Sequence, residues 1–377
     1  MSGPFGSTLK GDAYLSSGDI AFIRVQNIKG GFDINDNDLV YISNKDNEKI
    51  KSSSLQEGDL ILSKVGNSIG YFAKVSSDLG KCNISENNIG IKLSSYSDIE
   101  KSFILTYLNA KYANKLVLRR KSGNAQPKIN VDDLCRIPIL IFPKLSENIH
   151  NLIQLHEAYL NQSILSYKQA EDILNKELGI TNIENTKNYS VKSFSESFGE
   201  SNRLDAEYYQ DKYTQLFDII KNGKQLKELV TITKSIEPGS DEYKDEGIPF
   251  LRVSNLTKFG LTDSNVFLDR KKYENLLKPR KDTILFSKDG SIGIAYKAES
   301  DLDCITSGAL LHLSVKKTTI LPDYLALVLN SKIVQLQAER DSGGSIINHW
   351  RLPEIEMVLI PMLDYDIQNQ ISQKVQE

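Results

Sequence analysis

Ile20-Ala-Phe-Ile-Arg-Val-Gln-Asn-Ile28 recurs 228 residues later as Ile248-Pro-Phe-Leu-Arg-Val-Ser-Asn-Leu256, and this repeat shows how the chain is organised. A second stretch, Ile61–Gly70 (ILSKVGNSIG), returns as Leu285–Gly293 (LFSKDGSIG) with one residue fewer. Three shorter matches follow in the same order: Leu108–Lys111 with Leu329–Lys332, Ser122–Gly123 with Ser342–Gly343, and Ile141–Pro143 with Leu359–Pro361. Because five matches in one order do not arise by chance, the chain carries two copies of one domain.

The first half of each copy is rich in predicted strands. The runs FIRVQNI (22–28) and FLRVSNL (250–256) alternate and contain many β-branched and aromatic residues, which predicts strands. The segment GDLILSKVGNSIG predicts a strand that enters a glycine turn, followed by a second strand at Tyr71–Val75.

The second half of each copy begins with a predicted helix. Phe103–Leu118 and Tyr324–Ala338 lack Gly and Pro and have helical apolar spacing. A polar Ser-Gly stretch follows each helix, and a short apolar strand ending at Pro143 or Pro361 completes the copy. The predicted fold class is therefore mixed α/β (α+β), with two repeated globular domains.

A long helix is expected between the copies. Residues 144–178 contain no Gly or Pro, and Gly179 stands where a C-terminal cap belongs. Thirty-five residues at ~1.5 Å each give a helix about 50 Å long. Its apolar stripe is typical of a coiled-coil-type helix and requires a partner. The residues expected to face that partner are Ile149, Ile153, Leu160, Ile164, Tyr167 and Leu174.

These features divide the chain into five segments: globular domains at 1–143 and 204–363, the spacer helix at 144–180, a linker at 181–203, and the start of a second spacer helix at 364–377. That second helix is expected to be about twenty residues short. The leader Arg203–Tyr209 before the second copy has no counterpart before Met1. Both ends are therefore expected to be clipped.

Composition excludes several classes of protein. With 40% hydrophobic and 25% charged residues in 377, the chain has ordinary globular composition. We find neither an apolar run of the ~18 residues that a membrane span needs nor a signal peptide. Three cysteines without a C-x-x-C pair indicate the reducing cytoplasm. A net charge of −3 excludes a generic polycation, although one face can still be basic.

Motifs for catalysis are scarce. The sequence contains no G-x-G-x-x-G, P-loop, H-E-x-x-H or G-x-S-x-G motif, so we expect no catalytic residue, metal or cofactor in this chain. Glu242-Tyr-Lys244 has the E-x-K spacing of some nucleases, but three residues recur by chance in charged loops. Cys82 and Cys304 occupy matching places in the copies and are interpreted as inert core residues.

Two corresponding loops are candidates for nucleic-acid recognition. The loop at 119–128 combines cations that neutralise phosphates with amides that pair with base edges. Its counterpart at 340–351 carries different side chains, as two readers of different sequences would. In the first loop the candidates are Arg119, Arg120, Lys121, Asn124, Gln126 and Lys128, and in the second they are Asn348, His349 and Arg351. Each loop also has an alternative interpretation. The first loop is a solvated loop that caps a helix with positive charge, and in the second loop Trp350 anchors the core.

Further basic residues are weaker candidates for DNA binding. Arg270, Lys271, Lys272 and Arg280 either track phosphates or are plain surface. Lys64 and Lys288 each precede a glycine turn. Arg24 and Arg252 recur in a predicted strand, so they serve the fold as readily as DNA.

The two copies, the long helix between them and the leader Arg203-Leu-Asp-Ala-Glu-Tyr-Tyr209 resemble the specificity subunit of type I restriction-modification systems. The resemblance covers nearly the whole chain. It implies that 1–143 and 204–363 are target recognition domains, each reading one half of a split double-stranded DNA sequence. It also implies that paired helices set the gap between the half-sites.

The resemblance further implies partner subunits. These are two DNA adenine methyltransferase (M) subunits and the restriction/translocase (R) subunits, to which S-adenosylmethionine, ATP and magnesium would belong. The specificity subunit itself is not an enzyme, acts in the cytoplasm and has no membrane partner. Because the second helix is short, we expect part of the 144–178 stripe to be covered by another chain, either a methyltransferase or a second copy through self-association.

Two alternatives remain at this point. One is the recognition chain of another, type II-like DNA methyltransferase or defence system, which would share these domains. The other is a non-catalytic, repeat-built scaffold for protein interactions, which predicts no DNA binding with or without a methyltransferase.

Overall fold

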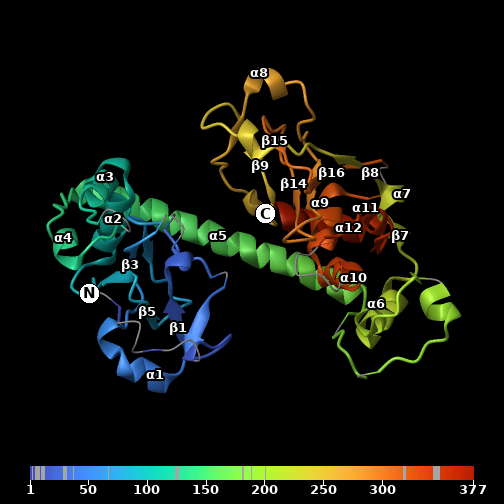
Figure 1. Cartoon of the computed structure of the whole chain (residues 1–377), viewed down its shortest axis with the longest axis horizontal. Helices are drawn as coiled ribbons and strands as arrows, with labels where there is room; N and C mark the ends of the chain where they lie inside the picture. The colour runs from blue at the N-terminus through green and yellow to red at the C-terminus, as the bar shows by residue number, and fades with distance from the viewer. Residues whose placement is uncertain are drawn as a thin grey trace. The chain divides into compact units, whose positions relative to one another are not determined.

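The computed structural model describes residues 1, 3–4, 9, 13–28, 32–36, 38–66, 68–123, 127–180, 182–187, 189–199, 201–316, 320–342 and 349–377. The chain divides into two compact units, Met1–Tyr159 and Leu160–Glu377. Both units contain helices and small sheets, so the predicted mixed α/β class is confirmed (Figure 1).

Two three-stranded sheets form the centre of the first unit. Their strands are β1 (Ile20–Ile23), β2 (Val40–Ile42), β3 (Leu60–Ser63), β4 (Phe72–Lys74), β5 (Cys82–Ile84) and β6 (Asn88–Ile91). In one sheet β1 lies between an antiparallel β2 and a parallel β5. In the other, β3 lies between antiparallel β4 and β6. All four residues of both β1 and β3 are buried, as expected for strands covered on both faces.

Short helices surround these sheets. They are α1 (Asn44–Lys49), α2 (Asp98–Asn109), α3 (Lys111–Arg119) and α4 (Val131–Cys135), with 3₁₀ turns η2 (Val25–Asn27) and η3 (Lys51–Ser53). The sequence S-x-x-E explains the start of α2, because Ser97 and Glu100 form a reciprocal capping box. The inner faces of α2 and α3 pack Leu105 and Val117 against β3 and β4.

The second unit is built on a four-stranded antiparallel sheet in the order β14-β13-β16-β8. A three-stranded sheet, β12-β9-β15, and the pairs β10–β11 and β17–β7 complete it. The strands are β7 (Lys224–Gln225), β8 (Val230–Lys234), β9 (Ile248–Leu251), β10 (Leu256–Thr257), β11 (Gly260–Leu261), β12 (Phe267–Leu268), β13 (Ile284–Ser287), β14 (Ala295–Lys297), β15 (Ile305–Thr306), β16 (Leu310–Val315) and β17 (Leu359–Ile360).

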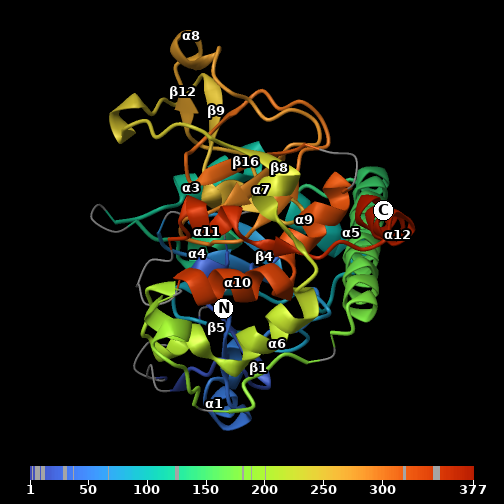
Figure 2. The same cartoon turned by 90° about the vertical axis from the view of Figure 1, so that its right-hand side faces the viewer.

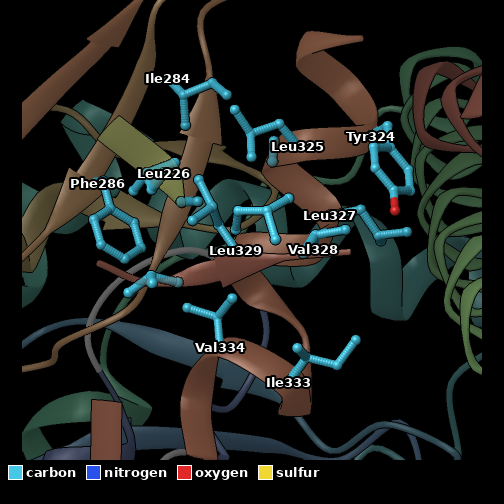
Figure 3. Close-up of a cluster of buried hydrophobic side chains, with 14 of the residues drawn as sticks. Leu226, Ile284, Phe286, Tyr324, Leu325, Leu327, Val328, Leu329, Ile333 and Val334 are labelled. Carbon is cyan, nitrogen blue, oxygen red and sulfur yellow. The ribbon is translucent and has the colours of Figure 1, made fainter. Parts of the chain in front are cut away.

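The helices of the second unit pack around its sheets. They are α6 (Asp211–Ile220), α7 (Leu226–Leu229), α8 (Arg270–Tyr273), α9 (Pro322–Asn330), α10 (Lys332–Ser342), α11 (Leu352–Glu356) and α12 (Tyr365–Gln376), with short turns η4 (Ser195–Gly199), η5 (Ala206–Tyr209), η6 (Ser240–Glu242) and η7 (Val253–Asn255). Helix α9 is central: Leu325 and Leu329 point toward Ile284 and Phe286 of β13 (Figure 3). The Tyr324 hydroxyl donates to the Pro361 carbonyl at 2.8 Å.

The repeated motif R-V-x-N forms the same turn in both copies. The predicted strands are shorter than expected, because each ends just before its arginine and a 3₁₀ turn follows. Asn27 accepts from the Arg24 amide at 3.0 Å, and Asn255 accepts from the Arg252 amide at 3.0 Å. The asparagine amide groups then donate to carbonyls further along, at Asn35 and Asp263. The motif therefore holds the chain as it leaves the first strand.

The repeated Leu-Asn-[Ala/Ser]-Lys motif ends a helix. Each predicted helix, 103–118 and 324–338, is in fact two helices, α2–α3 and α9–α10. Asn109 exchanges two hydrogen bonds with the backbone of Phe72 in β4, and Asn330 does the same with Ala295 in β14. Since these bonds bind the helix end to a strand, the next residue is extended and the helix restarts.

The predicted long helix is present as α5 (Pro143–Glu177). The boundary between the two units falls inside it, after Tyr159. In the second unit, the end of α12 lies beside α5, where the Ser166 hydroxyl donates to Glu377 at 3.0 Å (Figure 2). The two copies differ at their ends. Residues 139–142 of the first copy form no strand, whereas Leu359–Ile360 of the second copy form β17. No helix in the described part of the chain is long and apolar enough to cross a membrane.

Candidate nucleic-acid interface

The first candidate loop is attached to the glycine turn that follows β3. Ser122 and Lys128 exchange backbone hydrogen bonds of 3.0 and 2.9 Å, which closes the loop between them. Lys128 also forms a bridge with Val65, and the Ile129 amide donates to the Lys64 carbonyl at 3.1 Å. The structure therefore brings Lys64 and the loop together, although Asn124 and Gln126 lie outside the described residues.

The second candidate loop is attached in the same way. The Trp350 amide donates to the Lys288 carbonyl at 2.9 Å, and His349 forms a bridge with Asp289. These two contacts correspond to the Ile129–Lys64 hydrogen bond and the Lys128–Val65 bridge of the first copy. Asn348 lies outside the described residues. The two copies thus present different sequences from one backbone frame.

Exposed positive charge surrounds the closure of the first loop. Arg119 and Arg120 at the end of α3, and Lys121 and Lys128 beside the loop closure, are exposed. None of the four has an ion-pair partner among the described residues, whereas the Lys64 ammonium donates to the Glu86 carbonyl at 3.2 Å. Four unpaired cations around one loop give a surface suited to phosphate contacts. Arg119 also lies in the last turn of α3, so the helix-cap interpretation applies to it as well.

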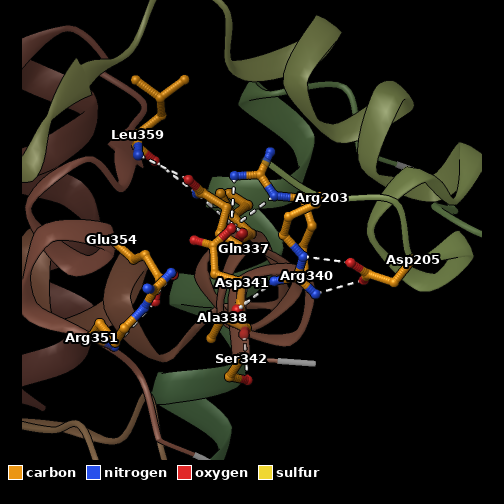
Figure 4. Close-up of polar contacts among 11 residues, drawn as sticks. Arg203, Asp205, Gln337, Ala338, Arg340, Asp341, Ser342, Arg351, Glu354 and Leu359 are labelled. Carbon is orange, nitrogen blue, oxygen red and sulfur yellow. Dashed lines mark hydrogen bonds and ion pairs between the residues drawn. The ribbon is translucent and has the colours of Figure 1, made fainter. Parts of the chain in front are cut away.

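The counterpart of Arg119 in the second copy has a structural role. Arg340 pairs with Asp341 and lies over the rings of Tyr208 and Phe217, at 4.9 and 4.3 Å from their centroids. Tyr208 belongs to the leader segment, whose Arg203 holds Asp205 in a bidentate pair and donates to the Asp341 carbonyl (Figure 4). The leader therefore covers α10, and Arg340 is not a free cation.

The second loop carries a short polar chain instead of free cations. His349 hydrogen-bonds Asp289, which pairs with the buried Lys288. The Lys288 ammonium is therefore engaged inside the protein. Arg351 is exposed and donates to Glu354 at 2.9 Å, a pairing that raises the pKa of the guanidinium. Exposed His349 and Arg351 can still present donors to a ligand.

Trp350, for which two interpretations were open, is a core residue. It is fully buried and packs against Phe286 with ring centroids 5.8 Å apart.

The basic run at 270–281 is largely neutralised. Arg270 and Lys278 both pair with Asp303, and Arg280 pairs with Asp301 at 3.2 Å. Hydrogen bonds from Lys278 and then Arg270 hold the pKa of Asp303 below its usual value. Among the described residues Lys271 has no ion pair, so it is the one free candidate of this group there.

In the E-x-K stretch at 242–244, the acidic side chain is held in an ion pair. The Glu242 carboxylate pairs with Lys272, which lowers the pKa of Glu242. The part of the chain that is described holds no group of three or more His, Cys, Asp or Glu side chains placed to bind a metal ion.

The two repeated arginines lie in the R-V-x-N turns. Arg24 and Arg252 are half-buried, and their amides are held in the R-V-x-N turns. The Arg24 guanidinium donates to the Asp38 carbonyl at 2.6 Å. The Nε atoms of both side chains are buried and have no hydrogen-bond partner among the described residues.

Buried titratable side chains lie in the cores. Burial raises the pKa of Cys82 to about 12 and that of Cys304 to about 11, so both thiols stay protonated at neutral pH. Burial also lowers the pKa of His312 to about 4, where Thr306 hydrogen-bonds its Nε2 at 2.7 Å. The interpretation of the cysteines as inert core residues agrees with this placement.

The apolar stripe of α5 is divided between covered and exposed residues. Ile149 and Ile153 are half-buried, and Leu160 and Ile164 keep 45% and 48% of their surface exposed. Tyr167 and Leu174 are instead buried in the core of the second unit, in one cluster with Ile371 of α12. Tyr167 is therefore not a free surface residue, contrary to the expectation that another chain covers it.

A model of the type I restriction modification DNA specificity domain matches residues 221–377. No curated protein matches the sequence. Among solved structures, the chain is similar to the S subunit of a type I restriction-modification system from M. genitalium, with 13% identity over 100% of this chain and 85% of that one and a TM-score of 0.41. It is also similar to the HsdS subunit from Thermoanaerobacter tengcongensis, with 15% identity over 95% and 82% of the chains and a TM-score of 0.34.

The fold is a duplicated module, in which one backbone frame carries two chemically different loops. Residues 221–377 of this chain match the type I restriction modification DNA specificity domain. The resemblance expected from the repeated motifs is confirmed for this part of the chain.

Proposed function

We propose that the chain is the DNA-specificity subunit of a type I restriction-modification complex, in which each globular unit reads one half of a split DNA target. The observation that carries the proposal is the shared loop anchor, Lys64–Ile129 in one copy and Lys288–Trp350 in the other. The family match covers the second copy. The internal repeat extends the same role to the first copy.

The different loops support an asymmetric target. The first loop offers cations that have no ion pair among the described residues, and the second offers His349 and Arg351 beside the half-buried Asp289 and Glu354. Phosphate contacts by Arg and Lys position a protein on DNA, whereas contacts to base edges choose the sequence. Two loops of different chemistry on one frame therefore suit two different half-sites.

The remaining activities are assigned to partner subunits in this proposal. Two DNA adenine methyltransferase subunits dock on the helical part of the chain, where Leu160 and Ile164 of α5 are exposed. Restriction/translocase subunits join the complex, and the partners bind S-adenosylmethionine, ATP and magnesium. This chain contributes recognition without catalysis and works where the cell's DNA lies, in the cytoplasm.

The experiment is methylation-sensitive long-read sequencing of host DNA with and without this gene. The expected result is a two-part adenine-methylated motif that disappears when the gene is deleted. Replacing residues 119–128 should then change one half of the motif only. Replacing the exposed Lys45 of α1 with alanine should leave both halves unchanged. If deletion of the gene removes no methylated motif, the proposal is wrong.

A further inference from the structure

A small hairpin of the second unit grips helix α5. Strands β10 and β11 are joined by a two-residue turn, Lys258-Phe259. The Lys258 ammonium lies 4.4 Å from the centroid of the Tyr167 ring and pairs with Glu171 at 3.5 Å. The Phe259 ring meets the Tyr167 ring edge-on, with centroids 5.2 Å apart. A cation–π contact, an ion pair and an aromatic pair therefore meet on one turn of α5.

The base of this hairpin is fixed to the recognition fold. Asn255, from the R-V-x-N turn, immediately precedes β10 and donates to the Asp263 carbonyl at 3.1 Å. The Thr262 amide donates back to the Asn255 carbonyl at 2.9 Å, and Thr257 bonds to both Gly260 and Phe259 across the turn. Because both ends of the hairpin are held, it transmits the orientation of β9 to the helix.

The clamp is specific to the second copy. At the positions that correspond to Lys258 and Phe259, the first copy has Gly30 and Gly31, which bear no side chains for such contacts. The first unit is tied to its part of α5 by a different contact, the ion pair between Lys74 of β4 and Glu157. The aromatic clamp is therefore not a general requirement of this domain.

We infer that the Lys258–Phe259 hairpin clamps the second recognition unit on α5 and so determines which spacing between half-sites the subunit accepts. The inference rests on the proposed function. One base pair more or less between the half-sites displaces one of them by ~3.4 Å and rotates it by about 35° around the DNA axis. A reader held rigidly on its helix cannot follow that change, whereas a loosened reader can.

The experiment compares variants of the full chain, co-expressed with the methyltransferase subunits, by methylation-sensitive long-read sequencing of genomic DNA. Lys258→Ala and Phe259→Ala should leave both half-site sequences unchanged. They should also lower the preference for the wild-type spacing over spacings one base pair shorter or longer by about tenfold. Lys221→Ala, an exposed lysine at the end of α6, is the matched control and should keep the wild-type preference.

A charge reversal protects the test against misfolding. Phe259 is 54% exposed and Lys258 is exposed, so substitution removes little core packing. If Phe259→Ala abolishes methylation altogether, Lys258→Glu should still relax the spacing, and the added Glu171→Lys change should restore part of it. An unchanged spacing preference in all variants overturns the clamp, and so does a changed half-site sequence, because the hairpin would then be a base reader. A wild-type chain that yields no two-part motif overturns the proposed function and the clamp together.

Discussion

Lys297 of β14 and Asp323 of α9 form a buried ion pair, with 2.8 Å between the Nζ and Oδ1 atoms. Gln376 of α12 donates to the second oxygen of Asp323 at 2.8 Å, so a strand, a helix and the C-terminal helix meet at one carboxylate. Burial works against the charged lysine, but the hydrogen bonds with Asp323 and Glu299 outweigh it and raise the pKa of Lys297. The ion pair therefore contributes to the free energy of unfolding at neutral pH, and this contribution is lost as the pH rises through the raised pKa of Lys297.

Breaking this pair should destabilise the protein strongly. Lys297→Ala leaves a buried carboxylate without its cation, for which we expect a loss of about 3–5 kcal/mol in the free energy of unfolding. The double change Lys297→Met with Asp323→Leu removes both charges and should recover most of the loss. Urea denaturation followed by circular dichroism measures both. Equal losses in the single and double variants would contradict the prediction.

The unpaired cations of the first loop should dominate the salt dependence of DNA binding. Each phosphate contact contributes ~0.9 to the slope of log affinity against log salt concentration. Alanine at Arg119, Arg120 and Lys121 should therefore lower the slope by up to about 2.7. Fluorescence anisotropy of the chain on a random 30-base-pair duplex measures this.

The matched control neutralises Arg270, Lys272 and Arg280, which are already in ion pairs. Because their carboxylate partners cancel their charge, the slope should change by less than half as much. A larger change than that produced by the loop variant would identify 270–280 as the principal phosphate contact.

Acid should weaken the second unit through His312. Its pKa falls from 6.5 to about 4 on burial, so the unfolded chain binds a proton that the folded chain does not. Above pH 6.5, the pKa in the unfolded chain, His312 does not reduce the free energy of unfolding. As the pH drops from 6.5 to about 4, that free energy falls by about 3 kcal/mol. Urea unfolding at several pH values should show a smaller acid loss for His312→Gln. The exposed His156→Gln is the control and should behave like the wild type.

The exposed and buried residues of the α5 stripe should respond differently to substitution. Leu160→Ser with Ile164→Ser should lower capture of the methyltransferase subunits about tenfold while the melting temperature stays unchanged. Tyr167→Ala should instead cost about 3–5 kcal/mol in stability, because it empties a packed core site. Co-purification and thermal denaturation separate the two effects. Normal assembly of the Leu160 and Ile164 variant would exclude this face as the docking surface.

The repeat and the long helix could be predicted from sequence because both depend on local patterns. The predicted helix at 144–178 and the observed α5 at 143–177 differ by one residue at each end. The breaks in the shorter helices could not be predicted from periodicity, because they depend on Asn109 and Asn330 reaching strands 35 or more residues away. The recurrence of Leu-Asn-[Ala/Ser]-Lys was the signal for this contact, although by itself it indicated only a repeat.

The sequence shows where the basic residues lie, but it does not show which of them are free of tertiary contacts. Arg119 and Arg340 occupy corresponding places, yet one is exposed and the other lies against Tyr208, more than 130 residues earlier. Likewise, Arg270 and Lys271 are neighbours, but among the described residues only Arg270 pairs with an aspartate, Asp303, which lies just before β15. Which cations are free depends on tertiary contacts, so the candidate list from sequence is broader than the surface that the structure leaves unpaired.

The loop anchors join main-chain atoms, the amides of Ile129 and Trp350 and the carbonyls of Lys64 and Lys288. Hydrogen bonds of this kind do not depend on which side chains the loop carries. Under the proposed function, substitutions at the exposed loop positions, unlike those at the buried Trp350, can therefore alter the DNA sequence recognised while the free energy of folding stays nearly constant. New specificities can evolve in small steps, one half-site at a time, without passing through unstable intermediates.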